Sequence, residues 1–477
     1  MDSSSRRRVL QVLATGTAVG VAGCAGGTDT ETEPTTAGST TTEPTTGTTA
    51  SSTTDATTEE PVALTDEERV ALAKRVTMEL ADGDFQAVHD RLTDTAAGQL
   101  SVDQLAQAWA TYGEPLGAFR GATVEQVAET RGQPLVVLRA TFERGVLRVV
   151  TVFDGERLSG LQIQPVQQSY QPPAYADEDA FVERARTLAS PACDLGATLT
   201  LPTAAADGDS TVPGVVLVHG SGPNDRNESF GPNRPFQDLA WGLASRGVAV
   251  LRYDKRTFAC DRAREDGLGL DALTVDDAVT ALDVLRGEDA VGSVAVVGHS
   301  QGGMAAPRIA ARADVDGMAS LAGSGGSLAE LVAVQVEYLA NVDGAVSDAE
   351  REQLDSVRDA VDRIQAGDLG DDEVVLGYHA DFWRDLAAYD QTAVAADLSV
   401  PRYVAFGGRD YQVPVERERP PWADALADAA NATLRTYESA NHLFLPGEGP
   451  STPGEYLQRE NVVEALVDDL AAWTDDL

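Results

Sequence analysis

The stretch Val296-Val297-Gly298-His299-Ser300-Gln301-Gly302-Gly303 joins an apolar run, 293–297, to a run of small residues, 304–312. The first run is typical of a buried strand and the second of a helix. Glycines two residues before and after Ser300 let the strand and the helix cross closely, because neither glycine carries a Cβ atom. The pattern therefore predicts a serine raised on a tight turn, where a base can reach its hydroxyl. The alternative is a solvated serine in a glycine-rich turn.

This strand–turn–helix motif resembles the nucleophile elbow of the α/β-hydrolase superfamily, in which an acid and then a histidine follow the serine along the chain. The chain has five histidines, and only His379 and His442 follow Ser300. His442 comes after a predicted strand, 433–437, near the carboxyl end. His379 lies in an amphipathic helical stretch, which favours a position in a lid or pocket. We therefore expect His442 to be the base.

Asp410 is the expected acid. An apolar strand, 403–406, passes into a glycine turn that ends at this residue. Asp385 and Asp390 are weaker candidates because they lie on predicted helical segments. A triad of Ser300, His442 and Asp410 would make the serine hydroxyl a nucleophile for acyl transfer.

Acyl transfer also needs N–H donors for the oxyanion. One expected donor is the backbone of Gln301, directly after the nucleophile. The apolar run 215–218 predicts another buried parallel strand, and it ends in His219-Gly220-Ser221-Gly222-Pro223. We expect the second donor from Ser221, with Gly222 as the second choice, and we expect His219 to brace this loop through hydrogen bonds.

The amino-acid composition indicates the salt concentration in which the protein works. The chain holds 36 Lys and Arg against 76 Asp and Glu, a net charge of −40. Such carboxylates repel one another at low ionic strength, whereas the Debye length is only ~3 Å in 1 M salt. The balance resembles that of proteins from extreme halophiles. A cation-binding or acidic-tail protein is disfavoured because the acids are spread along the chain, and nucleic acid is not an expected partner.

The first residues predict export. Residues 1–23 resemble a twin-arginine lipoprotein signal peptide, with Arg6-Arg7-Arg8, a short apolar region and a lipobox before Cys24. Cys24 is the expected lipidation site, and 24–61 is a Thr/Ser-rich flexible stalk. We expect the protein on the extracellular face of the cell membrane, in contact with the membrane through this lipid anchor only.

Cys193 and Cys260 are the other two cysteines. Outside the cell they could form one disulfide, or they could stay as two buried free thiols, and the residues leave both alternatives open. Two cysteines alone do not make a metal site. No metal is expected.

The rest of the chain divides into two units. Residues 62–168 show helical periodicity followed by four extended segments, which predicts a small α+β domain of unknown role. After a linker, 169–189, strands alternate with helices through 190–477, as in a mostly parallel sheet with helices on both faces. The alternation breaks at about 324–400. That helical stretch is the predicted lid, with a plain helical insertion as the alternative.

A more specific resemblance rests on the segments 219–228, 231–236 and 251–256, which read HGSGPNDRNE, GPNRPF and LRYDKR. They resemble the bacterial and archaeal carboxylesterases of the esterase D type, which are grouped with dienelactone hydrolases and serine aminopeptidases. The resemblance implies a cofactor-free serine esterase that acts on small-molecule esters. A serine peptidase and a lipid-tethered binding protein with an inactive hydrolase fold are the alternatives. The oligomeric state stays open.

Overall fold

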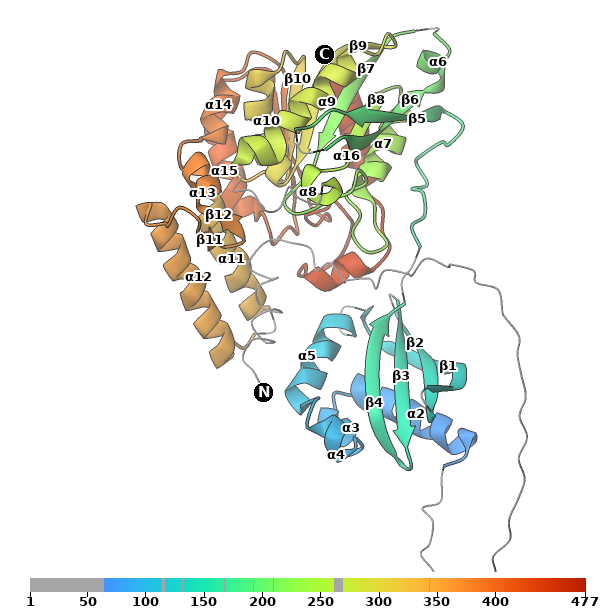
Figure 1. Ribbon diagram of the computed structural model, residues 1–477. Coiled ribbons are helices and arrows are strands. Elements are labelled where there is room, and N and C mark those ends of the chain that lie inside the picture. Colours follow the sequence, from blue (N-terminus) through green and yellow to red (C-terminus); the bar gives the residue numbers. More distant parts are fainter. Residues whose placement is uncertain are drawn as a thin grey trace, which may run out of the picture.

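The computed structural model describes residues 64–113, 116–130, 132–143, 145–166, 169–191, 193–208, 210–260, 269–342 and 344–477. In these ranges the chain forms two bodies, one after the other (Figure 1). None of the helices described has the length and apolarity needed to cross a membrane. The predicted signal peptide, Cys24 and the stalk lie outside the described residues.

The first body is a small α+β domain. Its elements are α2 (Asp66–Ala81), α3 (Phe85–Asp90), α4 (Asp94–Ala97), α5 (Val102–Tyr112), β1 (Phe119–Thr130), β2 (Gln133–Phe142), β3 (Val146–Asp154) and β4 (Arg157–Pro165). The strands form an antiparallel meander in chain order. Thr65 and Glu68 begin α2 with a capping box, which satisfies exposed N–H groups at the helix start. Buried apolar residues of the helices and the sheet share one core, so the predicted α+β unit is confirmed.

The second body is built on an eight-stranded sheet with the order β14-β13-β10-β9-β7-β8-β6-β5. The strands from β14 to β8 pair in parallel. Strand β6 pairs antiparallel with β8, and β5 pairs antiparallel with β6. Strands β8, β10 and β13 are buried along their whole length, which explains their largely apolar sequences. The strand bounds are β5 (Phe181–Leu188), β6 (Leu195–Pro202), β7 (Val212–Val218), β8 (Ala249–Tyr253), β9 (Val291–His299), β10 (Gly317–Leu321), β13 (Arg402–Gly407) and β14 (Ala432–Tyr437).

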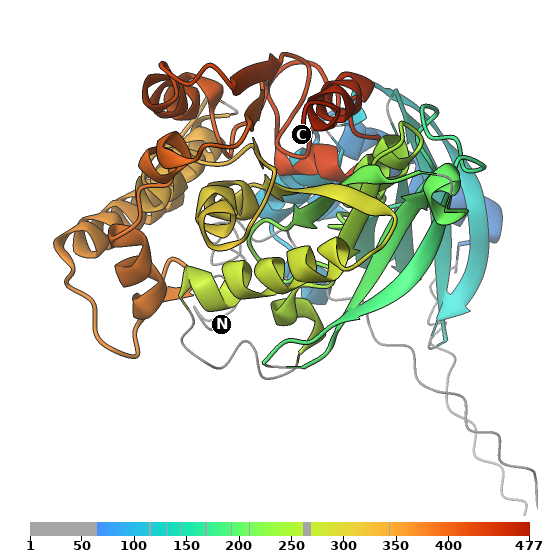
Figure 2. The same ribbon diagram turned by 90° about the horizontal axis from the view of Figure 1, so that it is seen from above.

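Helices cover both faces of this sheet (Figure 2). Alternate residues of β7 point to opposite faces. Val215 and Leu217 pack in the cluster that contains α7 and α16, whereas Val216 and Val218 pack with α9 and α10. The predicted α/β-hydrolase architecture is confirmed. The helices outside the lid region are α6 (Thr203–Ala206), α7 (Pro235–Ala244), α8 (Arg256–Ala259), η2 (Asp271–Val275), α9 (Asp276–Arg286), α10 (Gln301–Arg312), α15 (Val415–Ala425), η3 (Pro453–Leu457) and α16 (Glu464–Thr474).

The boundary of the second body differs from the prediction. Strand β5 lies inside the predicted linker 169–189 and pairs antiparallel with β6, so the sheet begins at Phe181 rather than after residue 190. The strand escaped notice because it is an edge strand whose middle residues are mostly exposed and polar. Only its two ends are buried, and without an alternating apolar face a strand has no sequence signature.

The stretch 324–400 is inserted between β10 and β13. It contains α11 (Leu328–Asn341), α12 (Asp348–Ala366), β11 (Val374–Val375), β12 (Tyr378–His379), α13 (Ala380–Ala387) and α14 (Gln391–Asp397). Figure 1 shows α11 and α12 side by side, extending beyond the sheet. Their buried residues belong to the same apolar cluster as α9 and α10, so the insertion packs on the core.

Tyr389, from this insertion, repairs a break in α10. Pro307 lies inside that helix, where proline interrupts the ladder of hydrogen bonds. The Tyr389 hydroxyl donates to the Met304 carbonyl at 2.8 Å and accepts from the Arg308 N–H at 3.3 Å. The Arg308 guanidinium lies 4.0 Å from the centre of the Tyr389 ring. The insertion therefore supports the helix that begins after Ser300.

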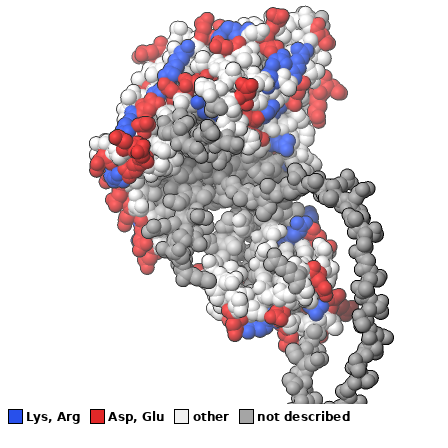
Figure 3. Space-filling model, viewed as in Figure 1, with Lys and Arg blue, Asp and Glu red and all other residues white. Residues whose placement is uncertain are grey.

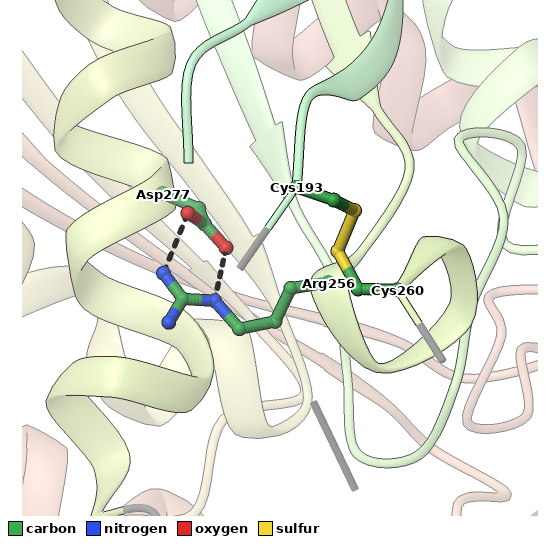
Figure 4. Close-up of a disulfide and its surroundings, with 4 residues drawn as sticks. All are labelled: Cys193, Arg256, Cys260 and Asp277. Carbon is green, nitrogen blue, oxygen red and sulfur yellow. Dashed lines mark hydrogen bonds and ion pairs between the residues drawn. A yellow bond between two sulfur atoms is a disulfide. The ribbon is translucent and has the colours of Figure 1, made fainter. Parts of the chain in front are cut away.

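Cys193 and Cys260 form a disulfide (Figure 4). It joins the segment before β6 to the end of α8. Beside it the Arg256 guanidinium makes two hydrogen bonds of 2.6 Å to the Asp277 carboxylate, and both side chains are buried. A charge-assisted pair with this geometry holds the first turn of α8 against α9.

We expect the double variant Cys193→Ser/Cys260→Ser to lose about 4 kcal/mol of unfolding free energy. The bond closes a loop with a sequence separation of 67, and loop closure of that length restricts the unfolded chain by about this amount. Urea unfolding in molar salt, followed by circular dichroism, measures the loss. Two free thiols in the unfolded, unreduced wild-type protein would contradict the bond.

Candidate active site

Ser300 stands on a strained turn between β9 and α10. Its backbone has φ 54° and ψ −116°, and it occupies the N-cap position of α10. Such a conformation is costly for any residue other than glycine and persists only where the surroundings enforce it. The Ser300 N–H donates to the Leu321 carbonyl of the neighbouring strand at 2.8 Å, which is one such restraint.

The two glycines of the motif are required by close packing. A Cβ atom on Gly298 would lie 2.1 Å from the Gly302 carbonyl oxygen, and one on Gly302 would lie 2.2 Å from the Val218 carbonyl oxygen. Both contacts are with backbone atoms, which cannot move aside as a flexible side chain can. The spacing of the motif thus follows from how β9, β7 and α10 cross.

The structure brings the three predicted catalytic residues together. His442 Nδ1 lies 2.7 Å from Asp410 Oδ2, and His442 Nε2 lies 3.0 Å from Ser300 Oγ. Asp410 and His442 are buried, and Ser300 is half-buried. Because an ionised carboxylate only accepts, Nδ1 carries the proton toward Asp410 and leaves Nε2 free to accept the serine proton.

Asp410 is itself held in place by the backbone. Its second oxygen, Oδ1, accepts the N–H groups of Gln412 and Val413 at 2.8 and 2.9 Å. These bonds fold the turn after β13 around the carboxylate and orient it toward the histidine. Strand β13 and the glycine turn after it therefore place Asp410, the predicted acid, beside His442.

The weaker candidates have other partners. Asp385 Oδ1 forms an ion pair with Arg308 at 2.8 Å, and Asp390 caps α14 through two backbone N–H groups. His379 is half-buried at the start of α13. Within the described residues no hydrogen bond or ion pair joins these three side chains to Ser300, His442 or Asp410.

The loop 219–223, named here the oxyanion loop for its predicted role, packs against Ser300. A Cβ atom on Gly220 would lie 3.1 Å from Ser300 Cβ, and Ser221 lines the same cavity as Ser300 and Gln301. The Gln301 N–H belongs to the first turn of α10, where N–H groups have no partner within the helix and the helix dipole favours negative charge. Gly222, with φ 83°, continues the loop but does not line the cavity.

The cavity beside Ser300 has a volume of about 40 Å³. Helix α11 of the insertion forms one side of it, as expected for a lid. None of the lining side chains carries a formal charge. They are Ser221, Ser300, Gln301, Met304, Ser324, Leu328, Leu331, Val332, Gln335, Tyr378, Gln412 and Val413. Among the described residues no group of three His, Cys, Asp or Glu could hold a metal ion.

Tyr378 is a site residue that sequence reasoning missed. Its hydroxyl accepts from Gln301 Nε2 at 3.4 Å and hydrogen-bonds with the side chain of Ser221. Burial raises the pKa of Tyr378 to about 12, so the phenol stays protonated at neutral pH. Its ring stacks on Phe382 with 4.0 Å between centres. The insertion has no fixed spacing from the serine, so no signal in the chain pointed to this residue.

Glu228 was also missed, although it ends the segment HGSGPNDRNE. Its Oε1 accepts the Gly220 N–H at 2.7 Å, and its Oε2 lies 2.9 Å from His299 Nδ1. His299 Nε2 in turn lies 2.9 Å from the His442 carbonyl oxygen. Burial opposes the charged imidazole, but the Glu228 carboxylate and that carbonyl outweigh it and raise the pKa of His299. The buried pair of Glu228 and His299 thus links the loop 219–223, the turn at Ser300 and the loop that carries His442.

His219 does not brace the loop in the expected way. It is buried with its Nε2 unpartnered, and its ring contacts Phe236 and Tyr253 with 5.2 and 5.1 Å between centres. Burial lowers the pKa of His219 to about 4, so the ring is neutral at ordinary pH. The loop is held instead by Glu228, because a carboxylate is a stronger acceptor for its N–H.

Comparison with known proteins gives consistent matches. The alpha/beta hydrolase family matches residues 215–459, and a protein family of unknown function matches residues 73–158. Esterase EstD of Thermotoga maritima is 32% identical over 411 residues, which cover 86% of this chain and 95% of the relative.

Two solved structures resemble parts of this chain at low sequence identity. Est1E of Butyrivibrio proteoclasticus is 16% identical, with a TM-score of 0.39, over 61% of this chain and 99% of the other. A puromycin-hydrolyzing peptidase of Mycobacterium tuberculosis is 20% identical, with a TM-score of 0.40, over 72% of this chain and 46% of the other. At these scores neither structure adds to the assignment.

Asp410→Asn should lower kcat for a p-nitrophenyl ester by on the order of 10⁴, because an amide in that place disfavours the tautomer that accepts the serine proton. Steady-state kinetics in molar salt measure the change. Asp390→Asn is the matched control, since asparagine also caps a helix and the Asp390 side chain accepts N–H groups of α14. Equal activity of the two variants would contradict the role of Asp410.

Proposed function

The chain belongs to the alpha/beta hydrolase family and is a carboxylesterase-type hydrolase, and from this premise we propose that it cleaves esters through an acyl-enzyme on Ser300. One observation carries the proposal. Asp410, His442 and Ser300 form a continuous hydrogen-bonded chain of 2.7 and 3.0 Å beside a cavity. Nucleophile, base and orienting acid are the parts that acyl transfer requires.

The reaction has two halves. In the first, Ser300 Oγ attacks the ester carbonyl while its proton passes to His442 Nε2. The tetrahedral intermediate then collapses, and the alcohol leaves with that proton. In the second, water gives a proton to His442 and attacks the acyl group on Oγ, the acid departs, and the proton returns to Ser300. Asp410 stabilises the imidazolium in both halves without taking its proton.

The N–H groups of Gln301 and Ser221 are proposed to hold the oxyanion in each intermediate. Support comes from their position at the cavity and from the start of α10, whose first-turn N–H groups point outward. Preorganised donors of this kind stabilise developing charge without reorganising water.

The lining of the cavity favours neutral esters over aminopeptidase substrates. An aminopeptidase holds the substrate's ammonium group, and a carboxylate is the side chain that pairs well with it. No Asp or Glu is among the residues that line this cavity.

For location, we propose twin-arginine export, lipidation of Cys24 and display on the stalk 24–61 at the outer face of the membrane. The proposal rests on the sequence, because these residues lie outside the structure. The Cys193–Cys260 disulfide supports it, since disulfides persist chiefly in oxidising surroundings.

We also propose that the protein works in concentrated salt. Figure 3 shows acidic side chains spread over the visible face of both bodies, with basic ones between them. A net charge of −40 distributed in this way needs screening, which molar salt provides.

Ser300→Ala should reduce kcat by on the order of 10⁵–10⁶, because the nucleophile itself is lost. A fluorophosphonate probe should label the wild-type chain and not the variant, as mass spectrometry of the labelled peptide would show. A wild-type chain that resists the probe, or a variant that keeps its activity, would favour the inactive binding protein.

A series of p-nitrophenyl esters should show a preference for short acyl chains. The cavity of about 40 Å³ is a few times the ~10–15 Å³ that one water needs on a probe-based measure, so it suits a group of a few atoms such as acetyl better than an octanoyl group. Val332→Ala removes methyl groups from the α11 side and should shift the preference toward longer chains. Higher kcat/KM for octanoate than for acetate, or for aminoacyl anilides than for esters, would contradict this substrate class.

A further inference from the structure

Lys255 is a buried cation beneath the oxyanion loop. The chain has only two lysines, and this one follows β8 with 4% of its surface exposed. Its Nζ donates to the Gly220 carbonyl at 2.5 Å and to Gln301 Oε1 at 3.1 Å. Within the described residues both partners are neutral oxygens. A buried ammonium without a directly bonded carboxylate is costly, and the two oxygens that it binds must offset that cost.

The geometry of one peptide group suggests a role for this lysine. The Gly220 carbonyl and the Ser221 N–H belong to the same planar peptide unit, in which the two bonds point in opposite directions when the unit is trans. Lys255 pulls the carbonyl toward the interior. The Ser221 N–H must then point away from Lys255.

The other side of Gly220 is held as well. Its N–H donates to Glu228 Oε1 at 2.7 Å, and its carbonyl also receives Asn224 Nδ2 at 3.3 Å. Charged groups therefore restrain the backbone before and after Gly220. A flip of the 220–221 peptide would break the bond to Lys255 and turn a carbonyl toward the oxyanion.

The second contact of Lys255 reaches the other proposed donor residue. Gln301 Oε1 binds Nζ, while Gln301 Nε2 donates to the Tyr378 hydroxyl. The side chain is thus stretched between the interior and the insertion, at the start of α10. One ammonium group thus binds the carbonyl of the 220–221 peptide, which carries the Ser221 N–H, and the side chain of Gln301, the other proposed donor residue.

We propose that Lys255 is a positioning residue that fixes the 220–221 peptide and Gln301 so that both N–H groups point at the oxyanion. This inference rests on the proposed roles of Ser300, Ser221 and Gln301. A donor on the carbonyl also polarises the peptide, which strengthens its N–H as a donor. Lysine carries this charge as a compact ammonium, whereas the guanidinium of arginine, the chain's usual cation, is broad and planar.

The pH dependence offers a second approach. Burial lowers the pKa of Lys255 to about 8, and the carboxylates of Glu228 and Asp277 oppose that shift. Among the described residues, His219 also interacts electrostatically with Lys255, and it is already neutral above its pKa of about 4. As pH rises through about 8, Lys255 loses its charge and the Gly220 carbonyl loses a charged donor. The rate of acyl transfer should then fall while substrate affinity stays constant.

The test compares Lys255→Met with Lys74→Met in the full chain. Methionine matches the length of lysine without its donor, and Lys74 is the other lysine, exposed on α2. With p-nitrophenyl acetate in molar salt, Lys255→Met should lower kcat by about 10–100-fold and change KM by less than about threefold. A lost oxyanion donor costs on the order of 10²–10³, and misalignment costs part of that. Lys74→Met should match the wild type.

A trifluoromethyl ketone separates positioning from simple destabilisation, because it forms an oxyanion on the serine. Its inhibition constant should rise by the same factor by which kcat falls. A rise in KM instead, an unchanged kcat, or an equal loss in Lys74→Met would overturn the inference. Failure of the wild-type chain to react with a fluorophosphonate at Ser300 would instead overturn the proposed function.

If Lys255→Met does not fold, as judged by circular dichroism, the wild type still decides the matter. Its kcat for p-nitrophenyl acetate, measured from pH 6 to pH 10, should decline above about pH 8 at constant KM. A flat profile to pH 10 would contradict the inference.

Discussion

The close crossing of β7, β9 and α10 is the constraint on which the site depends. Backbone atoms of Gly298 and Gly302 lie so close to their neighbours that no Cβ atom fits, and Ser300 between them takes a conformation that an L-residue rarely adopts. The parallel sheet stabilises this strained conformation, because β9 is a central strand that is buried on both faces. The turn sets the direction of the Ser300 hydroxyl, the start of α10 and the position of the N–H groups in the first turn of that helix.

A few buried charged side chains hold the polar groups around this turn in place. Glu228 links Gly220 to His299, and His299 reaches the carbonyl of His442. Lys255 holds the same loop from the other side. Burying such groups costs free energy. In exchange for that cost, the dipoles around the site are held in place and need not reorient as charge develops. The catalytic loops are thereby fixed to one another as well as to the sheet.

The surface and the cavity differ in charge. The chain as a whole carries a large excess of carboxylates, yet no formal charge lines the cavity beside Ser300. Charges on the surface are screened by water and salt, whereas an unpaired charge in a small cavity would be neither screened nor solvated. The insertion supplies much of the neutral lining, so it serves both the core and the pocket.

The sequence by itself determined the features that depend on local chemistry and chain order. The glycine spacing around Ser300, the apolar runs of the parallel strands, and the order serine, acid, histidine were all legible in it, as were the α+β domain and the inserted helices. Strand β5 was not, because an exposed edge strand needs no apolar face. Tyr378, Glu228 and Lys255 were not either. Their roles arise from contacts between segments far apart in the chain, and only the tertiary structure decides which hydroxyl, carboxylate or ammonium meets a given peptide group.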